Sequence, residues 1–199
     1  RPVLLYGHGL NSEFGEMGLL VDRLIDLGFA IVAAPALHHA DHPSRLDTEA
    51  VAALKFLGID LTGFQIDGMT MRGNFNQTNF ERLQLLELIR QVPQLPGDPR
   101  LIVDPAHTSY FGVSLGGILG SGLLAFDDEL RSGVLSVAGG QLMAFATDTE
   151  NVEQFRPILV NVFGGEGPFE RMLPVAQTLV DAADPASLAP SVILERRVE

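Results

Sequence analysis

The sequence predicts an α/β fold in which a mostly parallel sheet is flanked by helices. Short apolar runs that suit buried strands alternate with segments whose apolar residues recur at helical spacing. Glycines and prolines stand at most of the junctions between these segments. The chain has 199 residues, of which 46% are hydrophobic and 19% charged. It is therefore long and apolar enough for one ordinary domain, and no internal repeat or linker divides residues 1–199.

Glycines, caps and a proline set the limits of the expected helices in the first half of the chain. Gly28 and Gly58 stand where a glycine commonly ends a helix, and Asp47 is placed to cap the second helix. Thr78 to Glu81 forms a capping box, which predicts a helix start. The expected elements are a strand at residues 2–6, a helix at 12–27, a strand at 29–34, a helix at 47–57 and a helix at 78–92.

The second half of the chain continues the alternation. Residues 191–194 resemble the start of a strand, and the sequence stops five residues later. At the other end, the sequence runs directly into an apolar run and has no initiator Met. We therefore expect a fold truncated at both ends. The expected elements are a strand at residues 109–113, a helix at 115–126, a strand at 133–138, and helices at 152–162 and 169–183.

Charge and composition exclude several classes of function. The 25 acidic and 13 basic residues give a net charge of −12, and Lys55 is the only lysine, so we expect no nucleic-acid partner. The absence of cysteine excludes a disulfide scaffold, a thiolate nucleophile and a cysteine-ligated metal. The longest uncharged stretch, residues 105–126, contains five glycines. It suits a strand, turn and helix better than a membrane span, so no transmembrane segment is expected.

A GxSxG motif lies between an expected strand and an expected helix, at Gly112-Val113-Ser114-Leu115-Gly116. Small residues two before and two after a serine let the chain pass closely around a sharp turn that lifts the hydroxyl above the sheet. The first N–H groups of the following helix, beginning with that of Leu115, would face an oxyanion. Ser114 is therefore a candidate nucleophile. The alternative is a serine that caps a glycine-rich packing helix.

The tripeptide His8-Gly9-Leu10 directly follows the first expected strand. An oxyanion hole needs two donors, and the second usually comes from a backbone N–H in the loop after a neighbouring strand. The N–H of Leu10 is placed for this role, while His8 and Gly9, like Gly112 and Gly116, would support the site. The alternative is an ordinary turn between a strand and a helix.

With these motifs in place, the chain resembles the α/β-hydrolase superfamily. Residues 4–10 resemble its third strand and oxyanion loop, and residues 110–117 its fifth strand and nucleophile elbow. More loosely, the motifs at 7–10, 72–75, 112–117 and 184–185 resemble bacterial extracellular lipases and esterases. The resemblance implies an α/β-hydrolase fold, Ser114 as nucleophile, a small-molecule ester or lipid as substrate, no cofactor, and a secreted or cell-envelope location.

The base and acid of a serine hydrolase are missing from their expected places. The family order is serine, acid, histidine, and no histidine follows Ser114. We therefore expect both groups to lie outside these 199 residues. His107 is seven residues upstream, up to about 23 Å along an extended strand, and is expected in a surface loop.

Other polar residues leave alternatives open. His38, His39 and His42 suggest a solvated loop or pocket rim, a surrogate base, or, with Asp41, a zinc site. Among the acids, Asp148 has a plausible position for the triad, whereas Asp127 and Asp128 are expected to be solvated at a helix end and Asp184 to cap a helix or turn.

Two segments are candidates for covering the site. Residues 59–80 combine glycines, methionines and aromatic residues without clear periodicity, which suits either a mobile flap over an acyl pocket or an irregular loop on the sheet edge. Helices within residues 151–183 suit either a cap or the next crossover layer.

Together these features predict a serine hydrolase that cleaves carboxylic esters through an acyl-enzyme. Two alternatives remain: a non-catalytic module of the same fold that binds ligands, and an amidase or peptidase on the same scaffold. The oligomeric state is not predicted.

Overall fold

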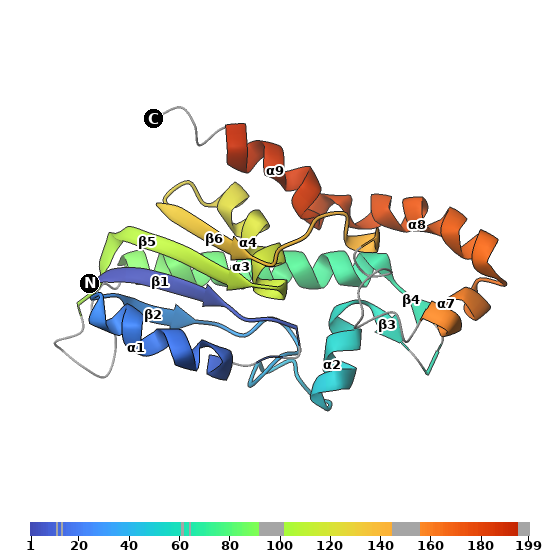
Figure 1. The fold of residues 1–199 in the computed structure, drawn as a ribbon, viewed down its shortest axis with the longest axis horizontal. Helices are drawn as coiled ribbons and strands as arrows, with labels where there is room; N and C mark the ends of the chain where they lie inside the picture. The colour runs from blue at the N-terminus through green and yellow to red at the C-terminus, as the bar shows by residue number, and fades with distance from the viewer. Residues whose placement is uncertain are drawn as a thin grey trace.

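The computed structural model describes residues 1–10, 12, 14–60, 62–63, 65–91, 102–144 and 156–194. It confirms an α/β architecture, with a parallel sheet flanked by helices (Figure 1). The sheet has the strand order β2-β1-β5-β6, and every pairing within it is parallel. Its strands are β1 (Pro2–Gly7), β2 (Ala30–Ala33), β5 (Asp104–Val113) and β6 (Ser132–Ser136).

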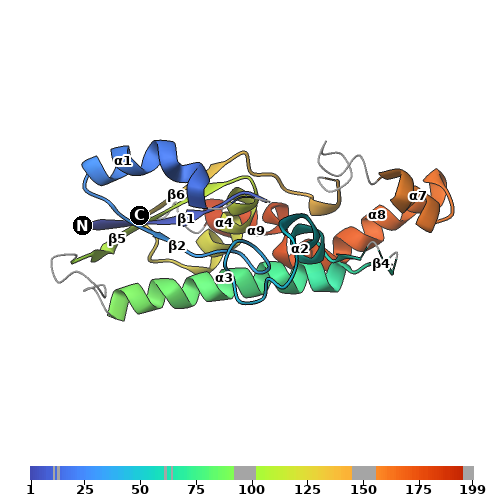
Figure 2. The same cartoon turned by 90° about the horizontal axis from the view of Figure 1, so that it is seen from below.

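Helices cover both faces of the sheet (Figure 2). A 3-10 turn, η1 (Phe14–Met17), leads into α1 (Gly18–Asp26), which packs on β2 from one side. The other side carries α3 (Gly68–Gln91) and α4 (Leu115–Phe126). Parallel strands joined through helices on both faces are the arrangement that the alternating sequence predicts.

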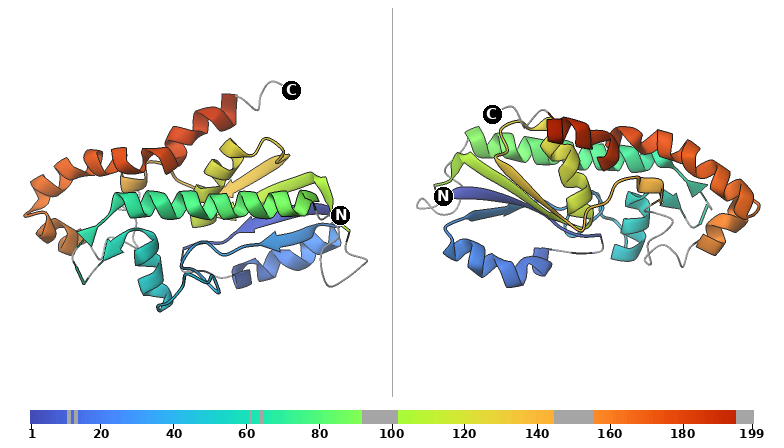
Figure 3. Two further views of the ribbon diagram at one scale, coloured as in Figure 1. Left: turned by 180° about the vertical axis from the view of Figure 1, so that it is seen from behind. Right: turned by 45° about the horizontal axis from the view of Figure 1, so that its top comes forward.

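The carboxyl ends of the strands point toward a second group of elements (Figure 1). Figure 3 shows α3 extending from the sheet to this group and passing beside α8. The group consists of α2 (Glu49–Phe56), the antiparallel ribbon β3 (Ile59–Asp60) and β4 (Gln65–Ile66), α7 (Arg156–Val162), α8 (Glu166–Val180) and η2 (Asp181–Ala183). The last helix, α9 (Pro185–Leu194), runs back from this group and packs against α4 (Figure 1).

Three buried clusters of the described residues hold the sheet and its helices together, and two of them pack against the start of α4 or the strand before it. One lies against the strands, where Leu5 and Tyr110 pack with Leu86 of α3 and Leu123 of α4. The other lies beyond the carboxyl ends of the strands and contains Leu115 with apolar residues of α2, α3 and α8. The second cluster therefore anchors the start of α4 to the elements on the carboxyl side of the sheet.

The prediction that a helix begins at Thr78 is wrong, because α3 begins ten residues earlier. Asp67 precedes the helix and accepts hydrogen bonds from the N–H groups of Met69 and Thr70, at 2.9 and 3.2 Å. The hydroxyl of Thr70 also donates to Asp67 and is the main cause of that carboxyl's lowered pKa. Thr78 lies inside the helix, and its hydroxyl donates to the carbonyl of Asn74 at 2.8 Å.

The expected flap at residues 59–80 is not one irregular segment. Its first part forms the β3–β4 ribbon, and residues 68–80 are the first half of α3. The helix predicted at 169–183 is confirmed as α8 and η2, and α7 accounts for part of the helix predicted at 152–162. Val152 and Phe155 lie outside the described residues.

Two further expectations about elements are wrong. Residues 191–194 belong to the last turn of α9 and not to a strand. Thr48 precedes α2 in an extended conformation, while Asp47 forms an ion pair with Lys55 instead of capping the helix. In the described part of the chain, no helix combines the length and apolar character that crossing a membrane requires.

Candidate active site

The GxSxG motif forms a sharp turn from β5 into α4. Ser114, half-buried, stands between them with φ 51° and ψ −114°, a conformation that costs a non-glycine residue on the order of 1–3 kcal/mol. Two hydrogen bonds hold it: its N–H donates to the carbonyl of Ser136 at 2.9 Å, and its carbonyl accepts from Ile118. The backbone conformation is therefore imposed by β6 and by the first turn of α4.

Close backbone contacts explain the glycines on either side of Ser114. A Cβ at Gly112 would lie 2.3 Å from the carbonyl oxygen of Gly116. A Cβ at Gly116 would lie 2.1 Å from the carbonyl oxygen of Gly7, at the end of β1. Both separations are far below a van der Waals contact. The turn from β5 into α4 therefore requires glycine at 112, and the start of α4 against β1 requires glycine at 116.

The turn after β1 lies beside the turn after β5. Gly7 pairs with Gly112 in the sheet, and the N–H of Gly116 donates to the carbonyl of His8 at 2.9 Å. Leu10 packs against the buried cluster that contains Leu115. The structure thus brings together the two segments that carry the candidate oxyanion donors. As the first residue of α4, Leu115 has an N–H that helix geometry leaves without an intrahelical acceptor.

His8 is fully buried, and both of its ring nitrogens are engaged. Nε2 accepts a hydrogen bond from the N–H of Ala36 at 2.9 Å, which requires the neutral ring with its proton on Nδ1. Nδ1 then donates to the carbonyl of Gly9 at 2.8 Å. These bonds fix the loop that carries Leu10, and they leave His8 unsuited to act as a base.

Backbone strain gathers at the carboxyl edge of the sheet. In the segments that the structure describes, positive φ angles outside glycine occur at His38, Ala40, Ser114, Val137 and Gln141. All five residues lie in the loops that follow β2, β5 and β6. Strained backbone of this kind clusters at functional sites, so this edge is the strongest candidate for one.

The three histidines in the loop after β2 (His38, His39 and His42) are not all exposed to solvent. His39 is buried against the rings of His8 and Phe56, which corrects the expectation that the whole cluster is solvated. His38 contacts Ser44, and His42 contacts Ser44 and Glu81. Across the described residues, no group of three His, Asp or Glu side chains is arranged to hold a metal ion.

His107 lies within β5 and not in a loop, because that strand begins five residues earlier than expected. It contacts Asp104 at 2.7 Å, and this hydrogen bond is the main cause of the lowered pKa of Asp104. Both residues are at the amino end of the strand, opposite to Ser114.

The acids have structural partners that the sequence did not indicate. Asp184 is fully buried and caps α9, as expected, but it also accepts from the N–H groups of Gln141 and Leu142 in the loop after β6. Asp127 is buried and bound by both oxygens to Arg90, which corrects the expectation that it is solvated. Asp128 is exposed, and Asp148 lies outside the described residues.

An apolar cavity of about 190 Å³ opens between the β3–β4 ribbon, the start of α3 and α8. Its walls include Met71 and Met143, which also belong to the buried cluster around Leu115. Ala176 lines it from α8. The cavity therefore adjoins the core behind the strained edge, and one of the two methionines within residues 59–80 contributes to it.

Sequence reasoning missed two side chains that support the turn after β5. Arg82 of α3 and Tyr110 of β5 are buried and hydrogen-bonded to each other. The signal for Arg82 was its spacing: it shares a helical stripe with Leu86 and Ile89, both buried. Tyr110 looked like part of an ordinary apolar strand.

The chain matches no family model and no curated protein sequence.

Proposed function

We propose that the protein is a serine hydrolase that cleaves carboxylic esters, with Ser114 as its nucleophile. The observation that carries this proposal is the strained Ser114 at the start of α4, tied through the bond from Gly116 to His8 to the loop that carries Leu10. The strand order also supports it, because β1 and β5 are neighbours and place both loops at one edge. This geometry is the one that an α/β-hydrolase elbow needs.

In the proposed reaction, Ser114 Oγ attacks the acyl carbon of the ester. The N–H groups of Leu10 and Leu115 donate to the oxygen on which negative charge develops. A base takes the serine proton and returns it to the leaving alcohol, which yields an acyl-enzyme. Water then attacks the acyl carbon and releases the acid, and no cofactor takes part in this scheme.

We propose that the base and its acid partner come from outside these 199 residues. His8 has both ring nitrogens in hydrogen bonds, and His107 lies at the opposite end of β5. Of the histidines after β2, His39 is buried against the rings of His8 and Phe56. His42 has Nε2 3.0 Å from Glu81 and Nδ1 2.8 Å from the hydroxyl of Ser44, and His38 Nδ1 lies 3.0 Å from the carbonyl of Ser44.

Labelling with a fluorophosphonate tests the proposal directly. We expect Ser114 to be labelled in the full-length gene product, and Ser114→Ala to abolish labelling. The matched control is Ser121→Ala, which removes a buried hydroxyl seven residues along the same helix that donates to the carbonyl of Ile118.

Each other result has a defined meaning. Unchanged labelling of the Ser114→Ala variant contradicts the proposed nucleophile. Labelling of the isolated 199-residue chain contradicts an external base and directs attention to the histidines after β2. If the full-length product is not labelled at all, the non-catalytic binding module becomes the better proposal.

The apolar cavity, which shares Met71 and Met143 with the buried cluster around Leu115, supports an apolar acyl group as the part of the substrate that is bound. It is lined by apolar side chains, and unbranched methionines accommodate chains of varied shape. We therefore propose that the preferred esters carry an acyl chain longer than acetyl.

Filling the cavity is expected to shift chain-length preference. Ala176→Phe places a ring in it, so we expect kcat/KM for an octanoate ester to fall about tenfold relative to that for acetate. The control, Thr178→Phe, adds the same ring to an exposed position of α8 outside the cavity. The measurement is hydrolysis of a p-nitrophenyl ester series, and an equal octanoate-to-acetate ratio in both variants would remove the cavity from the substrate site.

A further inference from the structure

We propose that Arg82 and Tyr110 are positioning residues that hold the two oxyanion donors in place through one chain of hydrogen bonds. The inference rests on the proposed function. The chain begins on α3, where Arg82 is 1% exposed. Its Nη1 donates to the hydroxyl of Tyr110 at 3.2 Å, and its guanidinium carbon lies 5.9 Å from the centre of the tyrosine ring.

The second bond joins Tyr110 to the turn after β5. Its hydroxyl donates to the carbonyl of Gly116 at 2.6 Å. Burial raises the pKa of this phenol, so it keeps the proton that the bond requires. The positive charge of Arg82 polarises the hydroxyl and strengthens the bond that it donates.

The remaining bonds connect Gly116 to the loop after β1. The N–H of Gly116 donates to the carbonyl of His8, and the ring of His8 donates to the carbonyl of Gly9. The Leu10 N–H belongs to the same peptide group as the Gly9 carbonyl, and the Leu115 N–H is in the peptide group before that of the Gly116 N–H. The hydrogen bonds therefore hold the backbone that carries each candidate donor. Arg82 and Tyr110 act on the reaction only through these peptides.

A second feature indicates that Arg82 is not there for stability alone. Within the described residues, its buried Nε and Nη2 have no hydrogen-bond partner. A buried charge that is only partly satisfied destabilises a fold, and an apolar side chain of similar size commonly replaces one without loss. A positioning role gives a reason for its presence that packing does not.

Tyr110→Phe tests the proposal because it removes the hydroxyl and leaves the ring. In the full-length gene product, we expect kcat for a p-nitrophenyl ester to fall at least tenfold while KM stays within about twofold, because a displaced donor weakens transition-state binding alone. Arg82→Met is expected to act in the same direction. The double variant should lose no more than the larger single effect, because both changes act through one bond.

Arg90→Met is the matched control. Arg90 lies on the same helix and is also largely buried, but its partner Asp127 is at the other end of α4. This variant should melt earlier than the wild type and keep its kcat. Equal losses of kcat in Tyr110→Phe and Arg90→Met would show a general effect of destabilisation and overturn the proposal.

Amide hydrogen exchange separates this proposal from the proposed function. We expect the Gly116 amide to exchange at least tenfold faster in Tyr110→Phe than in the wild type or in Arg90→Met. Exchange at the wild-type rate overturns the positioning role. If the wild type neither turns over ester nor accepts the fluorophosphonate, the proposed function fails, and faster exchange in Tyr110→Phe alone would still establish the hydrogen-bond chain.

Discussion

Gly116→Ala is expected to destabilise the protein by about 3 kcal/mol and to abolish labelling of Ser114. The added Cβ would lie 2.1 Å from the carbonyl oxygen of Gly7 and 2.9 Å from its Cα. Both are backbone atoms of a central strand, so no side-chain rotation relieves the overlap. Either α4 moves away from β1, or the end of β1 moves with the His8 loop.

The measurement is thermal unfolding together with fluorophosphonate labelling of the full-length product. For a domain of this size, 3 kcal/mol corresponds to a decrease in Tm of about 6–12 °C. Gly73→Ala is the control, because apart from its chain neighbours and the backbone of its own helix no described atom lies within 4 Å of its Cβ position on the exposed side of α3. Alanine is the better helix former, so this variant should be more stable by up to about 1 kcal/mol. A Gly116→Ala protein with wild-type Tm would contradict the close approach of α4 and β1.

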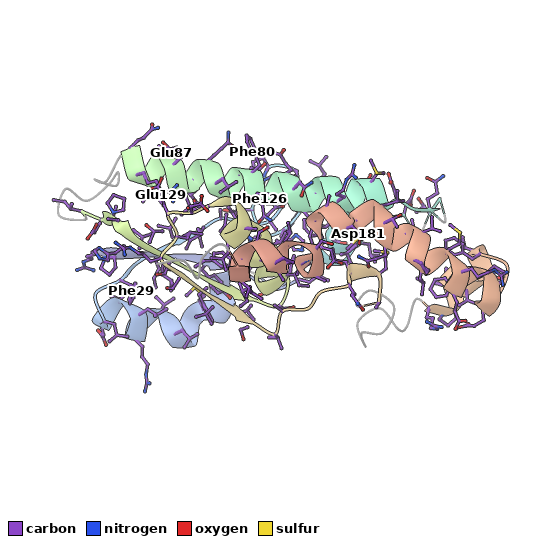
Figure 4. All side chains as sticks on the ribbon, turned by 90° about the horizontal axis from the view of Figure 1, so that it is seen from above. Phe29, Phe80, Glu87, Phe126, Glu129 and Asp181 are labelled. Carbon is purple, nitrogen blue, oxygen red and sulfur yellow. The ribbon has the colours of Figure 1, made fainter. Side chains whose placement is uncertain are left out.

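Asp127→Ala is expected to cost about 3 kcal/mol, because it leaves the guanidinium of Arg90 without its buried partner. The two groups are joined at 2.7 and 2.9 Å, and the same carboxylate accepts from the N–H groups of Glu129 and Leu130. Two other acidic residues near the guanidinium of Arg90, Glu87 and Glu129, are labelled in Figure 4. Both are exposed, so neither replaces a buried partner.

Urea unfolding of Asp127→Ala and Glu87→Gln compares the two kinds of partner. Glu87 Oε2 is 4.0 Å from Arg90 and more than half exposed, so its loss should change the free energy of unfolding by less than about 0.5 kcal/mol. Similar losses in the two variants would mean that burial does not distinguish these pairs. Labelling of Ser114 should survive in both, because the ion pair lies away from the turn after β5.

Local patterns were sufficient to locate the four strands of the parallel sheet, although β5 begins five residues earlier than predicted, and to locate the turn after β5. The GxSxG motif predicts a sharp turn at the serine with small residues two before and two after it. The structure has this turn at Ser114, with close backbone contacts at Gly112 and Gly116. The error at residues 191–194 has the opposite cause: a short apolar run does not distinguish a strand from a buried helical turn. The better signal was Asp184 followed by Pro185, a cap and a first-turn proline.

Most of the side-chain contacts that support the site join residues far apart in the sequence, so no local sequence pattern indicates them. Arg82 and Tyr110 are 28 residues apart, and Arg90 and Asp127 are 37 apart. Periodicity shows which face of a helix is buried, but not which polar group on another element will meet it. For the same reason the burial of His39 against Phe56 could not be expected from the run of histidines alone.

The backbone conformation of Ser114 has a consequence for how this sequence changes over generations. Glycine adopts a φ of 51° with little penalty, whereas serine is held there at a cost on the order of 1 kcal/mol or more. Mutations that stabilise a fold at the expense of activity arise readily at such positions. A lineage released from selection for catalysis should therefore accept glycine at residue 114 early, so retention of serine among descendants would itself record that the hydroxyl is used.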